Sequence, residues 1–262
     1  MKKASLLLIA LLLVVLSACG ASSSSGENGK KTIVMGTSAD YPPFESVDTQ
    51  HGNKIVGFDI DMAKYIANKL GYNLQIKNQD FDGLIPALNS KRIDFVMAGM
   101  VDTPAREKQV DFSKTYYNSY QVVLARKGEN IKTLNDLKGK KVGVQLGTTQ
   151  ETLATQLNKR LPMTLQKWDK LNEMVEALRM KRVDAVITVD TVAYGYTNKY
   201  KDLNQFNIKA TGPAKGLSTS DPISVAFPKN SKLTAKFNKV LDQMDKNGEK
   251  QKLVNKWIKS QK

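Results

Sequence analysis

Short apolar segments alternate with amphipathic helical segments from residue 32 onward, and this alternation constrains the fold more than any other feature of the chain. Strands are predicted at 32–36, 74–77 and 94–98, and helices at 58–70 and 84–89. Strands separated by helices at this spacing favour a parallel or mixed sheet that the helices cover. The sequence therefore predicts an α/β fold.

The first helical pattern carries its own boundary signals. Met62 and Ile66 lie on one apolar stripe, Asp59 is placed to cap the start of the helix, and Gly71 is placed to stop it. The pattern therefore predicts an amphipathic helix with one buried face.

A second unit repeats this organisation. It comprises predicted strands at 141–145, 164–168, 184–189 and 223–227 and predicted helices at 148–160, 171–181 and within 231–258. Residues 88–96 also resemble residues 178–186, since each segment reads as a helix end, a basic turn and a buried strand. This echo favours two similar lobes; coincidence of a common helix-to-strand turn is the alternative.

The N-terminus has the features of a secretory signal. Met1-Lys2-Lys3 is basic, and the apolar run 6–16 is shorter than the roughly 20 residues that span a bilayer. A short membrane anchor or a buried helix is the alternative interpretation. Ser17-Ala18-Cys19-Gly20 follows and resembles a bacterial lipobox, which implies a signal peptide over 1–18, cleavage before Cys19 and a lipid on its sulfur.

Cys19 is the only cysteine, so no intramolecular disulfide can form. Residues 19–31 are rich in serine and glycine and are predicted to be a flexible tether. A doubly or triply acylated cysteine anchors a protein to a membrane far more firmly than one chain does.

The net charge of +15 raises the question of a nucleic-acid partner. The lysines are scattered among acidic residues, however, and the densest group is only Lys138, Lys140 and Lys141. The chain has one histidine, His51, and no metal-ligand spacing. We therefore expect no nucleic-acid partner, metal or cofactor, and we expect a monomer whose basic surface suits an anionic cell envelope.

Four segments stand out along the chain: Gly36 to Glu45, Gly57 to Ala63, Phe81 to Leu88 running on to Gly99–Arg106 and Val110–Ser113, and Leu137 to Gln145 running on to Gly147–Glu151. Together they cover nearly the whole mature chain, and they resemble the polar amino acid family of bacterial ABC-transporter solute-binding lipoproteins.

The resemblance implies a two-lobed periplasmic-binding-protein-like fold of type II, in which two crossover strands act as the hinge. It places lobe 1 at 32–119 plus 217–262 and lobe 2 at 120–216, with crossovers near 118–122 and 212–219. It also implies that a small L-amino acid binds between the lobes, closes them by a hinge motion and is delivered to membrane permease subunits.

An amino acid zwitterion needs a cation and N–H donors for its carboxylate, and a carboxylate for its ammonium group. Arg106 follows a Thr-Pro helix start, where its guanidinium and free backbone N–H groups can converge on one carboxylate. From the residues alone, an exposed arginine paired with Asp102 or Glu107 is equally consistent; the resemblance implies the ligand role.

By the same resemblance, the segment around Gly147 forms the second half of the carboxylate site, whereas a plain threonine N-cap is the alternative. Asp190 ends a buried strand at the place where the family's ammonium-binding acid lies, in a loop whose register is ambiguous. Tyr41 and Phe81 match the family's aromatic sandwich. The full set of ligand-binding residues that we predict is Ser38, Asp40, Tyr41, Phe81, Gly99, Met100, Val101, Arg106, Gln145, Thr148, Thr149, Gln150 and Asp190.

Two positions depart from the family pattern. Val101 replaces the usual Ser or Thr, so a hydroxyl donor is missing. Ser38 replaces the aspartate frequent in binders of basic amino acids, while Asp40 lies two residues on. These changes bear on which amino acid binds.

Acidic residues close to the aromatic positions, Asp40, Glu45, Asp80 and Asp82, suit a cationic side chain such as that of arginine or lysine. Surface or capping roles for Glu45 and Asp82 are the alternative, and glutamine, histidine and cystine remain open as ligands.

We predict a non-enzymatic binding protein on the outer face of the cell membrane, lipid-anchored as in single-membrane bacteria. Two other classes stay open: a cyclohexadienyl dehydratase-like enzyme on the same fold, and a ligand-presenting sensor.

Overall fold

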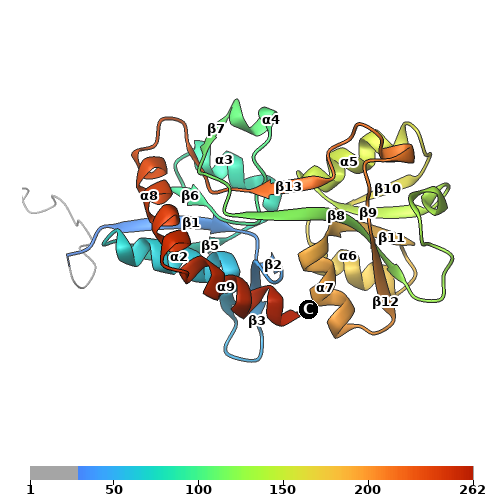
Figure 1. Ribbon diagram of the computed structural model, residues 1–262, viewed down its shortest axis with the longest axis horizontal. Helices are drawn as coiled ribbons and strands as arrows, with labels where there is room; N and C mark the ends of the chain where they lie inside the picture. Colours follow the sequence, from blue (N-terminus) through green and yellow to red (C-terminus); the bar gives the residue numbers. More distant parts are fainter. Residues whose placement is uncertain (1–28, 262) are drawn as a thin grey trace, which may run out of the picture. The chain divides into compact units, whose positions relative to one another are not determined.

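The computed structural model describes residues 29–261 (Figure 1), and the chain from Thr32 onward forms one compact unit. The predicted signal peptide, Cys19 and most of the predicted tether lie outside the described residues. Between residues 29 and 261, no helix has the length and apolar character needed to cross a bilayer.

The first sheet has five strands in the order β5-β1-β6-β14-β7. Their bounds are β1 Thr32–Thr37, β5 Asn73–Asn78, β6 Phe95–Val96, β7 Val110–Phe112 and β14 Ala226–Pro228. β1 pairs in parallel with β5 and β6, and β14 pairs antiparallel with β6 and β7. The predicted mixed sheet is therefore confirmed, and its last strand comes from near the end of the chain.

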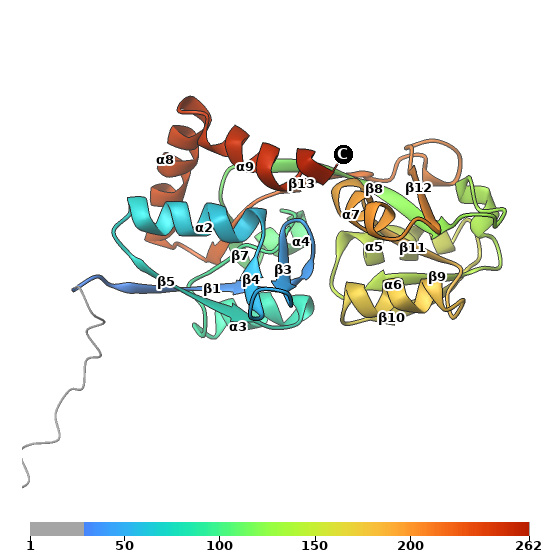
Figure 2. The ribbon, with the colours of Figure 1, turned by 90° about the horizontal axis from the view of Figure 1, so that it is seen from below.

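Four helices accompany this sheet: α2 Phe58–Lys69, α3 Leu84–Asn89, α8 Lys232–Lys246 and α9 Glu249–Trp257. Figure 2 shows α2 and α3 on opposite faces. Alternation along β1 accounts for this, because Ile33 and Met35 join the core under α2 and α8, whereas Val34 packs with the α3 residues. We call this sheet and its helices the first lobe.

The second sheet has the strand order β10-β9-β11-β8-β12. Its strands are β8 Tyr117–Arg126, β9 Lys141–Gln145, β10 Thr164–Trp168, β11 Ala185–Val189 and β12 Leu203–Asn207. Its helices are α5 Thr149–Asn158, α6 Leu171–Arg179 and α7 Asp190–Lys199. We call this sheet and its helices the second lobe.

Two adjacent strands connect the lobes. β8 pairs over Tyr117–Tyr120 with β13, Ser220–Ile223, and over its remaining length with β11 and β12 of the second sheet. Figure 1 shows β8 and β13 side by side between the two sheets. The first predicted crossover falls within β8, whereas the second was placed just before β13. This is the two-lobed type II fold that the sequence predicts.

The predicted strand at 223–227 is wrong, because β13 ends at Ile223 and β14 begins at Ala226. The helix α7, the strands β7 and β12 and several short elements were not predicted. A small antiparallel sheet contains β2 Asp40–Tyr41, β3 Glu45–Asp48 and β4 Lys54–Val56. The remaining elements are the short helix α4 Pro104–Glu107 and the 3₁₀ turns η2 Phe81–Gly83, η3 Leu134–Leu137, η4 Gly212–Ala214 and η5 Lys259–Gln261.

The prediction that Asp59 caps α2 is wrong. Gly57 occupies the N-cap position, with a φ of 142° and no side-chain cap. Asp59 lies inside the helix with its side chain fully buried, and its Oδ2 accepts hydrogen bonds from Gly99 N at 2.9 Å and Tyr116 Oη at 2.8 Å. Asp59 therefore fixes the loop after β6, which contributes to the site described below.

The internal sequence echo corresponds to a repeated local structure. Lys91 and Lys181 both have left-handed backbones, with φ of 57° and 62°. After each turn an aspartate carboxylate, of Asp94 or Asp184, accepts a hydrogen bond from a backbone N–H of the neighbouring strand, at 2.7 and 2.8 Å. The shared turn explains why two otherwise different segments look alike.

Candidate functional site

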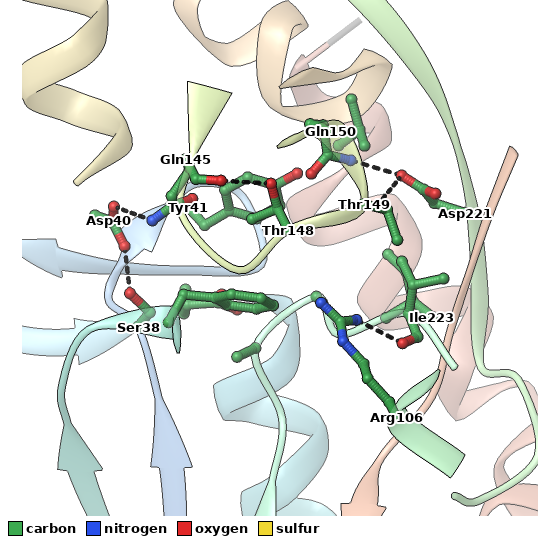
Figure 3. A pocket seen from close by; sticks show the side chains of 16 residues that line it. Ser38, Asp40, Tyr41, Arg106, Gln145, Thr148, Thr149, Gln150, Asp221 and Ile223 are labelled. Atoms are coloured by element: carbon green, nitrogen blue, oxygen red, sulfur yellow. Dashed lines mark hydrogen bonds between the residues drawn. The ribbon is translucent and has the colours of Figure 1, made fainter. Parts of the chain in front are cut away.

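One pocket is lined by residues of both lobes, and Figure 3 shows it from close by. All predicted ligand-binding residues except Met100 and Asp190 line it. The pocket also contains residues that the prediction did not include as ligand residues, which are Glu45, Ala98, Val189, Asp221 and Ile223.

Arg106 supplies a buried cation at one end of the pocket. It lies on α4, where Thr103 is the N-cap residue and Pro104 follows it. Its Nη1 donates to Val101 O at 2.6 Å and its Nη2 donates to Gly147 O, in the second lobe, at 2.8 Å. Burial lowers the pKa of Arg106 to about 10, so the guanidinium stays charged at neutral pH.

The loop between β9 and α5 faces Arg106. Gly147 adopts a left-handed φ of 73°, and a Cβ there would lie 3.0 Å from Asp82 Cβ. Thr148 caps α5 by accepting from Glu151 N at 3.1 Å, and its hydroxyl donates to Gln145 O at 2.7 Å. The N-terminus of α5 therefore carries its positive dipole end at the pocket wall.

Asp221, on the connecting strand β13, supplies a buried carboxylate in the same pocket. It accepts from Gln150 Nε2 at 2.6 Å, Gln121 Nε2 at 3.1 Å and Thr149 Oγ1 at 3.2 Å, and it is 2% exposed. Burial raises its pKa to about 6, and the donors and Arg106 partly offset that rise. The pocket thus contains a buried cation and a buried acid.

Asp190, which the sequence favoured as this acid, does not line the pocket. It begins α7, and its Oδ1 accepts from Tyr120 N at 3.1 Å and Thr191 N at 2.8 Å. Met100 does not line it either, because its side chain packs with Leu84 and Leu88 in the first lobe. Both residues lie next to pocket residues in the chain, but the Met100 side chain packs in the core and the Asp190 carboxylate accepts hydrogen bonds from the backbone.

Asp40 and Ser38 lie at another edge of the pocket, beside Gln145 (Figure 3). Asp40 Oδ1 accepts from Ser38 Oγ at 2.7 Å, and its Oδ2 accepts from Gln145 Nε2 at 3.1 Å and Leu171 N at 2.6 Å. Burial raises the pKa of the Asp40 carboxyl, and the hydrogen bonds from Ser38 and Leu171 N, together with the charge of Lys170, lower it in part. The two residues therefore form one connected polar group, with Ser38 donating to Asp40.

Glu45 is a second buried acid at the pocket wall. It is 0% exposed, and neither carboxyl oxygen accepts a hydrogen bond from a donor of the described residues. Burial, with the charges of Asp59 and Asp40, raises its pKa well above the usual range. The alternative of a surface role for Glu45 is wrong, whereas Asp80 and Asp82 are exposed and do not line the pocket.

Aromatic rings complete the walls. Tyr41 stacks on Phe44, with ring centroids 6.0 Å apart, and Phe81 lies under the Arg106 guanidinium at 5.3 Å. Gly99 has a left-handed φ of 56°, and a Cβ there would lie 3.2 Å from the Tyr41 ring. A glycine at this position therefore lets the backbone approach the ring closely.

The two acids absent from the predicted ligand-binding set carried weak signals. Glu45 was predicted as one of the acids that suit a cationic side chain, with a surface role as the alternative, because a single glutamate is usually exposed. Asp221 lies two residues beyond the predicted crossover and precedes Pro222 and the mostly apolar segment Ile223–Phe227. A crossover placed two residues later would have brought Asp221 to the site.

The described residues 29–261 give little support for a metal site or for a catalytic histidine. No group of three or more His, Cys, Asp and Glu residues there could hold a metal ion. His51 is exposed, and its Nδ1 pairs with Asp48 Oδ2 at 2.8 Å on a surface turn. The pocket lining contains no histidine, cysteine or lysine.

Comparison with known proteins gives consistent results. Residues 33–260 match the model of the bacterial extracellular solute-binding proteins, family 3. The chain is 43% identical, over the full length of both proteins, to the arginine-binding extracellular protein ArtP of Bacillus subtilis (strain 168).

Two solved structures are also similar. An ancestral arginine-binding protein bound to arginine is 43% identical with a TM-score of 0.79, over 87% of this chain and 98% of that one. The arginine-, lysine-, histidine-binding protein ArtJ of Geobacillus stearothermophilus is 33% identical with a TM-score of 0.78, over 87% and 95% of the two chains. On this evidence the chain belongs to family 3 of the bacterial extracellular solute-binding proteins.

Proposed function

We propose that this protein binds a basic L-amino acid of the arginine type in the pocket and delivers it to the permease of an ABC importer. The observation that carries the proposal is the pair of opposite buried charges, Arg106 and Asp221, in one pocket. Arg106 and the α5 N-terminus would bind the α-carboxylate, and Asp221 would bind the ammonium group. The remaining predicted residues that line the pocket would surround the ligand.

The buried carboxyl of Glu45 supports a basic side chain. Neither oxygen accepts a hydrogen bond from another described residue, and the raised pKa favours the protonated acid, which shares a hydrogen bond with the Asp59 carboxyl. A guanidinium or ammonium group would supply both donors and positive charge, which reverses the effect of Asp59 and Asp40 on the Glu45 pKa. A neutral ligand side chain supplies at most donors.

The relatives favour the same ligand class. ArtP of Bacillus subtilis and the ancestral protein are named as arginine-binding, and ArtJ is named as arginine-, lysine- and histidine-binding. An ancestral arginine-binding protein was also solved with glutamine, at 42% identity and a TM-score of 0.78 over 87% of this chain and 98% of that one. Arginine is therefore our first choice, and glutamine is the neutral ligand to compare with it.

The cellular role follows from the same proposal. We place the protein on the outer face of the membrane, anchored through lipid on Cys19 and tethered by residues 19–31, with a signal peptide at 1–18. We propose that 32–119 plus 217–262 and 120–216 move as two lobes about β8 and β13, as a monomer. We also propose that the protein has no enzymatic activity; the pocket lining contains no histidine, cysteine or lysine, and the relatives reported above are binding proteins.

Thermal unfolding tests the proposal directly. The protein is heated with each common L-amino acid, cystine or no addition. A ligand present at 100 times its dissociation constant stabilises the folded state by about 2.7 kcal/mol, which raises the midpoint of a chain of this size by about 5–10 °C. We expect the largest shift with arginine. If no amino acid moves the midpoint, the proposed function is wrong.

Replacing Glu45 by glutamine tests the ligand class. We expect arginine affinity to fall roughly 10- to 100-fold, because a hydrogen bond to a charged partner contributes about 1.5–3 kcal/mol. Affinity for citrulline, whose ureido group is neutral, should change much less. Calorimetric titration of both ligands measures this, and Glu107→Gln, on the exposed side of α4, is the control. Equal losses for both ligands would contradict the charge role of Glu45.

A further inference from the structure

The start of helix α6 has no cap from its own surroundings in the chain. Lys170 occupies the N-cap position and makes no side-chain cap hydrogen bond. Helices leave their first N–H groups without intrahelical partners, and an unsatisfied buried donor is costly. The first of these groups, Leu171 N, instead donates to Asp40 Oδ2 at 2.6 Å. Asp40 lies on β2, so the first lobe supplies the cap for a helix of the second.

The other hydrogen bonds of Asp40 also connect the two lobes. Its Oδ2 also accepts from Gln145 Nε2, in the second lobe, while Oδ1 accepts from Ser38 Oγ in the first. Both oxygens are therefore engaged by protein donors, and Asp40 is only 7% exposed. Next to this group, Lys170 Nζ pairs with Asp80 Oδ1 at 2.6 Å, which is a second contact between the lobes.

We propose that Asp40 is a closure contact: its carboxylate joins β2 of the first lobe to the N-terminus of α6 in the second and holds the pocket shut around whichever ligand it contains. This deepens the proposed function and rests on it, since it concerns retention of the ligand in the same pocket. It also gives Asp40 a role different from that of Glu45, whose oxygens have no protein donor.

The physical reason is that separation of the lobes removes two of the three donors of Asp40. Leu171 N and Gln145 Nε2 belong to the second lobe, so both hydrogen bonds break when the lobes part. The carboxylate and the α6 N–H groups then form hydrogen bonds with water instead. Since protein donors already engage both oxygens of Asp40, the contact favours the closed arrangement by the same amount for every ligand.

The experiment compares Asp40→Ala with the wild type for two ligands, L-arginine and L-citrulline. Loss of a helix cap and of a second charge-assisted bond is expected to raise the dissociation constant about 10-fold, which corresponds to about 1.4 kcal/mol. A closure contact raises it by the same factor for both ligands, mainly through faster dissociation in stopped-flow measurements. A loss confined to arginine would overturn the proposal, because it would show that Asp40 contacts the ligand's charge.

Asp136→Ala is the matched control. Asp136 also caps a helical turn, η3, and accepts from Lys132 N, Thr133 N and Thr133 Oγ1, but all of these lie within the second lobe. We expect it to lower the unfolding midpoint and to leave ligand dissociation unchanged. If it accelerates dissociation as much as Asp40→Ala does, general destabilisation explains both and the closure contact is rejected.

Asp40→Asn is the second variant to test, in case Asp40→Ala does not fold. Asparagine keeps an acceptor oxygen but loses the charge, so we expect a smaller rise in the dissociation constant, about threefold, again equal for both ligands. An unequal rise rejects the closure contact here as well. If the wild type binds another amino acid and not arginine, the proposed function fails separately. The same comparison then uses that amino acid and a neutral or charged analogue of it.

Discussion

Replacing Arg106 by alanine is expected to weaken binding of an amino acid by about 100- to 1,000-fold. Truncating one partner of a buried, hydrogen-bonded charge pair costs about 2–5 kcal/mol, since the other charge is left in a dry site. Here the unpaired charge would be the ligand carboxylate, and the acid Asp221 would remain in the pocket without a protein cation beside it. Calorimetric titration with arginine measures the loss.

Two arginine-to-lysine variants separate this effect from stability. Arg106→Lys keeps a positive charge but not the planar fork that can bind a carboxylate through two parallel hydrogen bonds, so we expect an intermediate loss, about 10-fold. Arg126 is equally buried, but it binds Glu129 and the carbonyl oxygens of Leu178 and Val183, away from the pocket. Arg126→Lys should lower the unfolding midpoint and leave affinity unchanged. An Arg106→Ala protein that binds arginine within threefold of the wild type would refute the assigned role.

The second large effect is expected at Asp221. Asp221→Asn replaces a carboxylate by an amide whose N–H₂ group meets donors on Gln150, Gln121 or Thr149, and it removes the only charge assigned to the ligand ammonium. We expect binding to weaken about 100-fold. Asp190→Asn is the comparison that decides between the two acids, and it should change the affinity by less than threefold. The opposite ranking would restore Asp190 as the ammonium-binding residue.

Asp221 also predicts how binding depends on pH. Burial raises its pKa to about 6, and an ammonium ligand binds the ionised form. Above pH 7 the carboxylate is already ionised, so affinity should be constant. Below pH 6 the acid must lose a proton before the ligand binds, and the dissociation constant should rise up to about tenfold per pH unit. In Asp221→Asn this part of the pH dependence should disappear, which titrations between pH 5 and 8 can measure.

Much of the fold was predictable because local patterns carry it. The period of apolar residues gave correct helices at α2, α5 and α6 and correct strands at β1, β5, β9 and β10, within one to three residues at each end. The ligand roles of Arg106 and Thr148 were predicted from the resemblance to a known family. Both residues lie at helix starts, but the local pattern alone left an exposed arginine and a plain threonine N-cap open.

Burial of the polar residues was not predictable from local pattern. Asp59 looked like a helix cap, yet it is fully buried beneath Gly99 and Tyr116. Glu45 looked equally like a surface residue and like a pocket acid. A polar side chain is buried or exposed according to which distant segment covers it, and neither its neighbours in the chain nor its own chemistry specifies that segment.

The sequence by itself determined the α/β class and the alternation of strands and helices, because hydrophobic period acts over a few residues. The expectation of two lobes, their crossovers and most of the predicted pocket residues followed from the resemblance of four sequence segments to a known family. Only the tertiary structure decided that Asp221 and not Asp190 faces Arg106's pocket, and that Asp40 caps a helix 131 residues further along the chain. These assignments depend on where β13 crosses between the lobes and on how β2 meets α6. Both are contacts between segments far apart in sequence, whose register is set by packing of the whole core and not by local propensity.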